Sequence, residues 1–144
     1  MQSRIPNWIL ATIIAISLIG FSDSAFLLSK RLSGGPIPCF VTTGCDTVSL
    51  SSYSTLWGIP LAAWGVAFYL GIGFLTLLYW DTKKEYLLKL IFTGTFAGFI
   101  MSAYFTYLQK FVIGAFCVYC LGSAVSSTTL FILSLIARKK LSSQ

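Results

Sequence analysis

Four long apolar runs divide the chain, and each one is long enough to cross a lipid bilayer as a helix. The runs cover residues 8–28, 59–80, 86–108 and 117–137. A helix rises about 1.5 Å per residue, so about 20 apolar residues span the roughly 30 Å of a hydrocarbon core. The pattern predicts an all-α integral membrane protein, a four-transmembrane-helix bundle that forms one domain over residues 1–144.

The first run differs from a cleaved signal peptide in two respects. It is longer than the apolar segment of a signal peptide, and no small-residue cleavage site follows it. We therefore expect a retained helix. Asp23, near the end of this helix, is either an interfacial carboxylate close to water or part of a proton route.

Residues 29–58 separate the first two runs and form the long non-spanning segment, which begins with turn-forming serine, glycine and proline residues. After Asp46, apolar residues recur at spacings of mostly three and four, which predicts a short amphipathic half-helix on the membrane surface. These residues are Val48, Leu50, Tyr53, Leu56 and Trp57. The sequence Gly58-Ile59-Pro60 ends the half-helix, and its proline suits the first turn of the next helix.

The third run carries small residues at every fourth position, namely Gly94, Gly98 and Ser102. Residues four apart lie on one face of a helix. A stripe of small residues lets membrane helices approach closely, so we expect this face to pack against a neighbouring helix.

Composition supports the membrane assignment and excludes several kinds of chemistry. Of the 144 residues, 56% are hydrophobic and 10% are charged, whereas soluble domains carry about a quarter charged residues. The chain has no histidine, which removes the commonest general base and transition-metal ligand. The net charge of +6 does not indicate nucleic-acid binding, because most lysines and arginines flank the apolar runs, where they determine topology.

Charge asymmetry predicts that both termini are cytoplasmic. With that orientation the cytoplasmic side holds Arg4, Lys83, Lys84, Lys89, Arg138, Lys139 and Lys140, and the outer side holds Lys30, Arg31 and Lys110. An excess of cations on the cytoplasmic side is the usual arrangement in membranes. It puts all four cysteines on the outer side, which suits oxidising chemistry.

The four cysteines form two pairs on that side. Cys39 and Cys45 lie in the loop at residues 29–58, and Cys117 and Cys120 open the last apolar run. Helix positions three apart share a face, and unpaired N–H groups at a helix start favour a thiolate. Two pairs at one membrane face suggest electron transfer by disulfide exchange, with the loop pair meeting a soluble protein and the helix pair meeting a molecule dissolved in lipid.

Other interpretations of the cysteines stay open. Four cysteines allow three pairings, between which the sequence alone does not choose. Cys117 and Cys120 could be inert buried residues of a helix, and Cys39 and Cys45 could form a structural disulfide. Four thiolates also suit zinc or copper, which would make this a thiolate metal-binding or transport membrane protein. A membrane scaffold without redox chemistry is a further alternative.

The order of these motifs resembles the vitamin K epoxide reductase (VKOR) family in its prokaryotic form. That order is a first span, a loop cysteine pair, a Gly-Cys-Asp-x-Val element at residues 44–48, a Ser-x-Tyr-Ser element at residues 51–54, the Gly-Ile-Pro sequence at residues 58–60, and Cys-x-x-Cys opening the last span. Each motif is weak alone, whereas their order and spacing together are specific. The resemblance runs from about Trp8 to Ala137.

The resemblance implies a four-helix bundle around a quinone of the ubiquinone, menaquinone or vitamin K type. It implies that Cys39 exchanges with a thioredoxin-fold (DsbA-like) partner, that Cys45 attacks Cys117, and that Cys120 faces the quinone. We expect the partner to be a separate protein, because no thioredoxin-like domain follows the last span. The implied activity is a membrane thiol-disulfide oxidoreductase that supports disulfide formation in secreted proteins, with no metal cofactor.

Two departures from the family pattern narrow the implied activity. Members that reduce the vitamin K epoxide have Thr-Tyr-Ala where this chain has Ser123-Ala124-Val125, and an asparagine where it has Ser54. These departures favour simple quinone reduction over epoxide reduction. The Gly-Ile-Pro form and the missing epoxide motif also favour a prokaryotic plasma membrane over the endoplasmic reticulum.

Three residues are our candidates for contacts with the quinone: Trp57, Phe111 and Ser123. The two aromatic rings could wall a ring site, and the serine could donate a hydrogen bond to a carbonyl group. Aromatic residues also form interfacial belts, and serines also pack between helices, so both structural roles remain alternatives.

Overall fold

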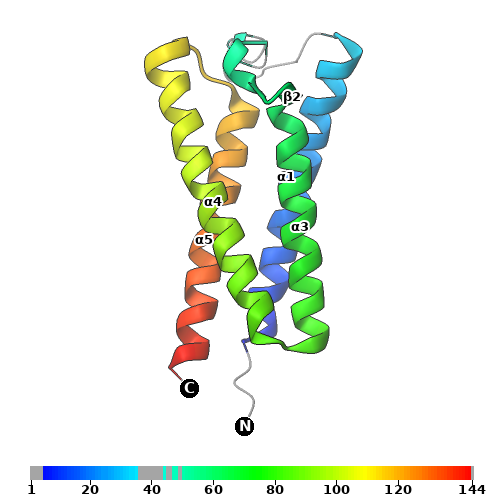
Figure 1. Ribbon diagram of the computed structural model, residues 1–144, viewed down its shortest axis with the longest axis vertical. Helices are drawn as coiled ribbons and strands as arrows, with labels where there is room; N and C mark the ends of the chain where they lie inside the picture. The colour runs from blue at the N-terminus through cyan, green and yellow to red at the C-terminus, as the bar shows by residue number, and fades with distance from the viewer. Residues whose placement is uncertain (1–4, 36–43, 45–46, 49, 144) are drawn as a thin grey trace.

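Four long helices make up the computed structural model, which describes residues 5–35, 44, 47–48 and 50–143 (Figure 1). The helices are α1 (Asn7–Ser33), α3 (Leu61–Thr82), α4 (Glu85–Tyr107) and α5 (Val118–Ser142). A π-helical turn, η2 (Leu108–Ile113), continues α4. Within the described ranges these are four helices long and apolar enough to cross a membrane, which confirms the predicted four-helix membrane bundle.

Two of the helices extend beyond the apolar runs. Helix α1 continues to Ser33 and ends at Gly34, whose φ of 71° gives the left-handed C-cap that glycine adopts readily. Helix α5 continues to Ser142, with Lys139 and Lys140 in its last turn, where cations interact favourably with the helix dipole. Hydropathy detects only the part of a helix that lies in lipid, so it misses these polar ends.

The helices form a ring in which α1 contacts α3 and α5, and α4 contacts the same two helices. The start of α1 and the end of α5 lie at one end of the bundle, which we call the terminal end (Figure 1). The end of α1, the start of α3 and the connection from η2 to α5 lie at the opposite end, which we call the loop end. The cysteine pair of α5 is at the loop end.

The main hydrophobic core fills the terminal half of the bundle. Ile9, Leu10 and Ile13 of α1 are fully buried there, together with Ile91 and Leu130. Two buried polar side chains of this half bond to each other: the hydroxyls of Thr95 and Ser134 lie 2.9 Å apart across α4 and α5. This half is therefore solid, and the space available for a ligand lies nearer the loop end.

The segment before α3 combines a trace of helix with a small β-hairpin. Thr47 and Val48 are helical, within the half-helix expected after Asp46. From Ser52 onward the chain instead forms a 3-10 turn, η1 (Ser52–Ser54), and two antiparallel strands, β1 (Thr55–Leu56) and β2 (Ile59–Pro60).

The hairpin turn explains why the predicted half-helix does not continue to Trp57. Trp57 and Gly58 both have positive φ values, 53° and 78°, as two-residue hairpin turns require. Glycine adopts this conformation freely. Pro60 has no N–H group, so it cannot donate the hydrogen bond that a helix running through it would need. Pro60 instead becomes the N-cap of α3.

Candidate active site

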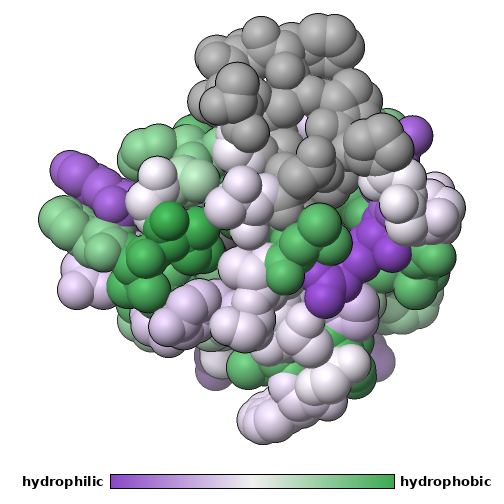
Figure 2. All heavy atoms as spheres, turned by 90° about the horizontal axis from the view of Figure 1, so that it is seen from above, coloured by the Kyte–Doolittle hydropathy of each residue, from purple (hydrophilic) through white to green (hydrophobic). Residues whose placement is uncertain are grey.

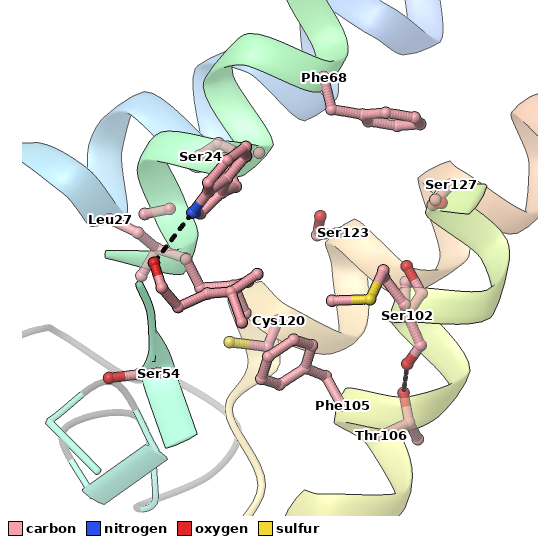
Figure 3. Close-up of a pocket in the computed structure, with 18 of the residues that line it drawn as sticks. Ser24, Leu27, Ser54, Phe68, Ser102, Phe105, Thr106, Cys120, Ser123 and Ser127 are labelled. Carbon is pink, nitrogen blue, oxygen red and sulfur yellow. Dashed lines mark hydrogen bonds between the residues drawn. The ribbon is translucent and has the colours of Figure 1, made fainter. Parts of the chain in front are cut away.

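A cavity of about 500 Å³ lies inside the loop-end half of the bundle. Side chains from all four long helices, from η2 and from the segment before α3 line it (Figure 3). Most of the lining surface is apolar, although nine residues with hydroxyl groups, one cysteine, Gln109 and Arg31 also line the cavity. This volume and character suit a small, largely apolar organic molecule.

Small residues keep the cavity open. Gly94, Gly98 and Ser102, the predicted stripe of α4, all line it. A Cβ atom added at Gly98 would lie 2.5 Å from the ring of Phe68 and 3.1 Å from the hydroxyl of Ser127. The stripe therefore leaves room for the cavity and for a ring from α3, in addition to letting helices approach.

The cysteine pair connects this cavity with the loop end of the protein. Cys117 is the N-cap residue of α5 and is completely buried. Its carbonyl accepts the first backbone hydrogen bond of the helix, from Leu121 at 3.0 Å. Cys120 lies in the first turn, and its side chain lines the cavity beside Phe105 (Figure 3). Both residues are thiols in this structure.

The thiol of Cys117 is the more acidic member of the pair. Its pKa is lowered from 9.0 to about 7, chiefly by a hydrogen bond with the thiol of Cys120. The backbone N–H groups of Cys120 and Tyr119 act in the same direction, while burial opposes them. The reduced pair therefore carries its negative charge on Cys117 near neutral pH, as expected for a thiol at a helix start.

Gln109 holds the backbone of Cys117 in place. Its side-chain Oε1 atom accepts a hydrogen bond from the N–H of Cys117 at 3.0 Å, and its carbonyl accepts one from Ala115 at 3.1 Å. Gln109 is 2% exposed and belongs to η2, and π-helical turns often occur at functional sites. Sequence reasoning missed this residue, although an amide eight positions before the cysteine pair in an apolar run was the available signal.

A second polar contact lies in the cavity wall. The hydroxyl of Tyr69, on α3, donates to the carbonyl of Ser123 at 2.9 Å and lies 2.8 Å from its hydroxyl. Both residues line the cavity next to Cys120, with Ser123 one turn further along α5. The cavity thus contains one of the three residues expected to contact a ligand, and Tyr69 is a neighbour that the sequence did not reveal.

The other two expected contacts, Trp57 and Phe111, lie away from the cavity. Trp57 is at the hairpin tip and is 83% exposed, while the neighbouring Trp64 lines the cavity. Phe111 is 65% exposed and packs against Tyr107, with ring centroids 4.9 Å apart. The hairpin and the π-helical turn point these rings outwards, and from α4 it is Phe105 that faces the cavity.

The loop cysteines, Cys39 and Cys45, lie outside the described residues. Their described neighbours nevertheless reach the start of α5. A Cβ atom added at Gly44 would lie 2.7 Å from the carbonyl oxygen of Phe116, so the two backbones are in close contact. Val48 forms one buried cluster with Cys117. The residues on both sides of Cys45 in sequence therefore pack against the segment that ends at Cys117.

The surface at the loop end is chemically mixed. Seen from this end, its described part carries both strongly hydrophobic and strongly hydrophilic residues (Figure 2). Arg31, near the end of α1, donates hydrogen bonds to Ser54 at 2.7 Å and to Thr55 at 2.9 Å. These bonds tie the hairpin segment to α1 above the cavity.

Comparison with protein families gives a match over most of the chain. The family model for the Vitamin K epoxide reductase family matches residues 11–135. The matched region includes most of α1 and α5, both intervening helices, the cavity and the cysteine pair of α5. A search of curated proteins found no match.

Proposed function

The chain belongs to the Vitamin K epoxide reductase family, whose members are membrane redox enzymes acting on disulfides and quinones, and we propose a specific route for its electrons. In this proposal a thioredoxin-fold (DsbA-like) protein donates two electrons to the Cys39–Cys45 disulfide. The electrons then pass to Cys117 and Cys120 and from there to a membrane quinone. The protein thereby keeps its partner oxidised and supports disulfide formation in secreted proteins.

The observation that carries the proposal is that Cys117 and Cys120 contact different parts of the protein. Cys117 packs against Val48, within the segment that contains the loop cysteines, whereas Cys120 lines the cavity. Disulfide exchange needs the Cα atoms of the exchanging cysteines within about 7 Å. The contact of Gly44 with Phe116 supports an approach of Cys45 to Cys117 over such a distance.

The exchange follows from this arrangement. Cys39 attacks Cys45 in a bond between Cys45 and Cys117, which restores the loop disulfide and releases Cys117. Its lowered pKa makes Cys117 a good leaving group in this step.

The cavity residues fit a quinone head group. The walls are mainly apolar, and the polar groups among them include the hydroxyls of Ser123 and Tyr69, which can hydrogen-bond to a carbonyl oxygen. A bound quinone supplies an acceptor for two electrons and two protons. Cys120 would supply the electrons at the cavity wall, and the apolar side chains would exclude water from the ring.

Residue identities in the cavity favour quinone reduction over epoxide reduction. Ser54 occupies the position of the asparagine found in epoxide-reducing members, and its hydroxyl already accepts from Arg31 and donates to the carbonyl of Ser51 at 2.6 Å. Ala124 occupies the position of their tyrosine and brings no hydroxyl to the cavity.

The distribution of cations supports the proposed orientation. Lys83, Lys84, Lys89 and the Arg138–Lys140 cluster lie at the terminal end of the described helices, while Lys30, Arg31 and Lys110 lie at the loop end. We place the terminal end in the cytoplasm and the loop end outside, in a prokaryotic plasma membrane.

A quinone-reduction assay tests the proposal. Purified protein in detergent is mixed with a water-soluble quinone and a reduced DsbA-like protein, and the loss of quinone absorbance is followed. Wild type should oxidise the partner and reduce the quinone in equal amounts, whereas Cys120→Ala should reduce none. Stoichiometric bound metal together with no quinone reduction by wild type would instead favour the metal-binding alternative.

A further inference from the structure

Asp23 is a carboxylate within α1 that the exchange steps leave without a role. Its Oδ2 atom is buried and has no hydrogen-bond partner within the part of the chain that the structure describes. No lysine or arginine of that part forms an ion pair with it. Burying an unpaired carboxylate in a membrane helix is costly, so its presence suggests a function.

The surroundings of Asp23 connect it with the cysteine pair. Phe26 and Leu27, one turn further along α1, pack against the buried cluster that contains Cys117. The groups close enough to interact electrostatically with Asp23 are Cys117 and Cys120 at the start of α5 and Tyr69 on α3. The carboxylate therefore lies within electrostatic range of both sulfurs that react.

Tyr69 connects the stretch of α1 around Asp23 with the cavity. Gly20, one turn before Asp23, has no side chain, and the ring of Tyr69 occupies the space where one would lie. The hydroxyl of Tyr69 then reaches the hydroxyl of Ser123 at 2.8 Å, and both residues line the cavity. Tyr69 thus lies between the stretch of α1 that carries Asp23 and the cavity wall at Ser123.

Oxidation of the dithiol requires a proton acceptor. Forming the S–S bond from two thiols releases two electrons and two protons, and the chain has no histidine to receive a proton. A tyrosine is a poor base because its ordinary pKa is about 10. Among the described groups within electrostatic range of the two sulfurs, the carboxylate of Asp23 is the one suited to accept a proton.

We propose that Asp23 is the proton acceptor of the Cys117/Cys120 dithiol. One proton leaves for the outer water when Cys117 becomes a thiolate. The second passes from Cys120 to Asp23 as the two sulfurs form their bond and their two electrons enter the cavity. Tyr69 and Ser123 return that proton to the cavity, and a second from the outer water completes the reduced acceptor. The inference rests on the proposed function, because a quinone must accept the electrons.

Asp23→Asn tests the inference in a single-turnover experiment. Wild type and variants are reduced with dithiothreitol, freed of reductant and mixed with a soluble quinone at several pH values. Asp23→Asn should slow quinone reduction near neutral pH by about 100-fold, which is typical when a general base is lost. Asp23→Glu should restore much of the rate. Asp81→Asn, which removes a carboxylate at the terminal end of α3, should leave the rate unchanged.

A second measurement does not depend on quinone. The negative charge of Asp23 opposes ionisation of Cys117, so Asp23→Asn should lower the pKa of Cys117 below about 7 in an ultraviolet thiolate titration. An unchanged titration curve would overturn the inference, as would wild-type quinone reduction by Asp23→Asn at every pH. A rate for Asp23→Glu as low as that of Asp23→Asn would also overturn it. If the wild type reduced no quinone, the proposed function itself would be wrong, and this result differs from the outcomes that overturn only the role of Asp23.

Discussion

Replacing Gln109 should damage the cysteine pair without touching either sulfur. The Oε1 atom of Gln109 is the partner of the buried N–H of Cys117, at 3.0 Å. Gln109→Leu would leave that N–H unsatisfied at a completely buried residue. An orphaned buried donor costs about 1–3 kcal/mol. We therefore expect the free energy of unfolding in detergent to fall by that amount, or the start of α5 to rearrange.

The activity of Gln109→Leu should fall with its stability. If the native position of Cys117 is destabilised by about 1–3 kcal/mol, its population relative to a rearranged one falls by about 5- to 150-fold. Thr93→Val is a matched control, because Thr93 is an exposed residue of α4 whose hydroxyl only bonds back to the carbonyl of Lys89. That variant should change stability by less than about 0.5 kcal/mol.

Gln109→Glu separates hydrogen bonding from charge. A carboxylate still accepts from the N–H of Cys117, but burying its charge at a residue that is 2% exposed also lowers the stability. Its negative charge opposes the thiolate and should raise the pKa of Cys117 above about 7. Steps that need the Cys117 thiolate speed up as pH rises through this pKa, so the half-maximal pH should shift upwards. Wild-type stability and pH profile in both variants would refute the role of Gln109.

Two further predictions concern the cavity and the orientation. Gly98→Leu should raise the quinone concentration for half-maximal rate about tenfold or more, because overpacking costs about 1–3 kcal/mol where an added Cβ already lies 2.5 Å from Phe68. Gly122→Leu is the control, because a Cβ added at Gly122 on α5 would lie in open space. Equal effects of both substitutions would argue against a ligand in the cavity. A membrane-impermeant thiol reagent should label the reduced loop cysteines in intact cells, and labelling only after lysis would reverse the proposed orientation.

The bundle could be predicted from the sequence because lipid imposes a simple rule. A spanning segment must satisfy its own backbone hydrogen bonds, so each long apolar run becomes a helix. The position of Cys117 and Cys120 at a helix start follows from the same boundary between polar and apolar residues. The polar ends of α1 and α5 were missed because they lie beyond the apolar stretch.

The lining of the cavity could not be predicted, because it depends on how the helices turn towards one another. Trp57 and Phe111 are close in sequence to functional elements, yet a hairpin turn and a π-helical turn direct their rings outwards. Tyr69 and Gln109 act through partners 54 and eight positions away in the chain. Such pairs become visible only when the helices are assembled.

The central claim is that electrons pass from the loop cysteines to the helix cysteines through a bond between Cys45 and Cys117. Cys39→Ala tests it most directly, because this variant lacks the thiol that resolves the intermediate. Mass spectrometry of peptides from non-reduced protein should find a Cys45–Cys117 disulfide, with Cys120 as a free thiol. A dominant Cys45–Cys120 bond would exchange the roles of the two helix cysteines, and the absence of any bond between loop and helix would contradict the relay.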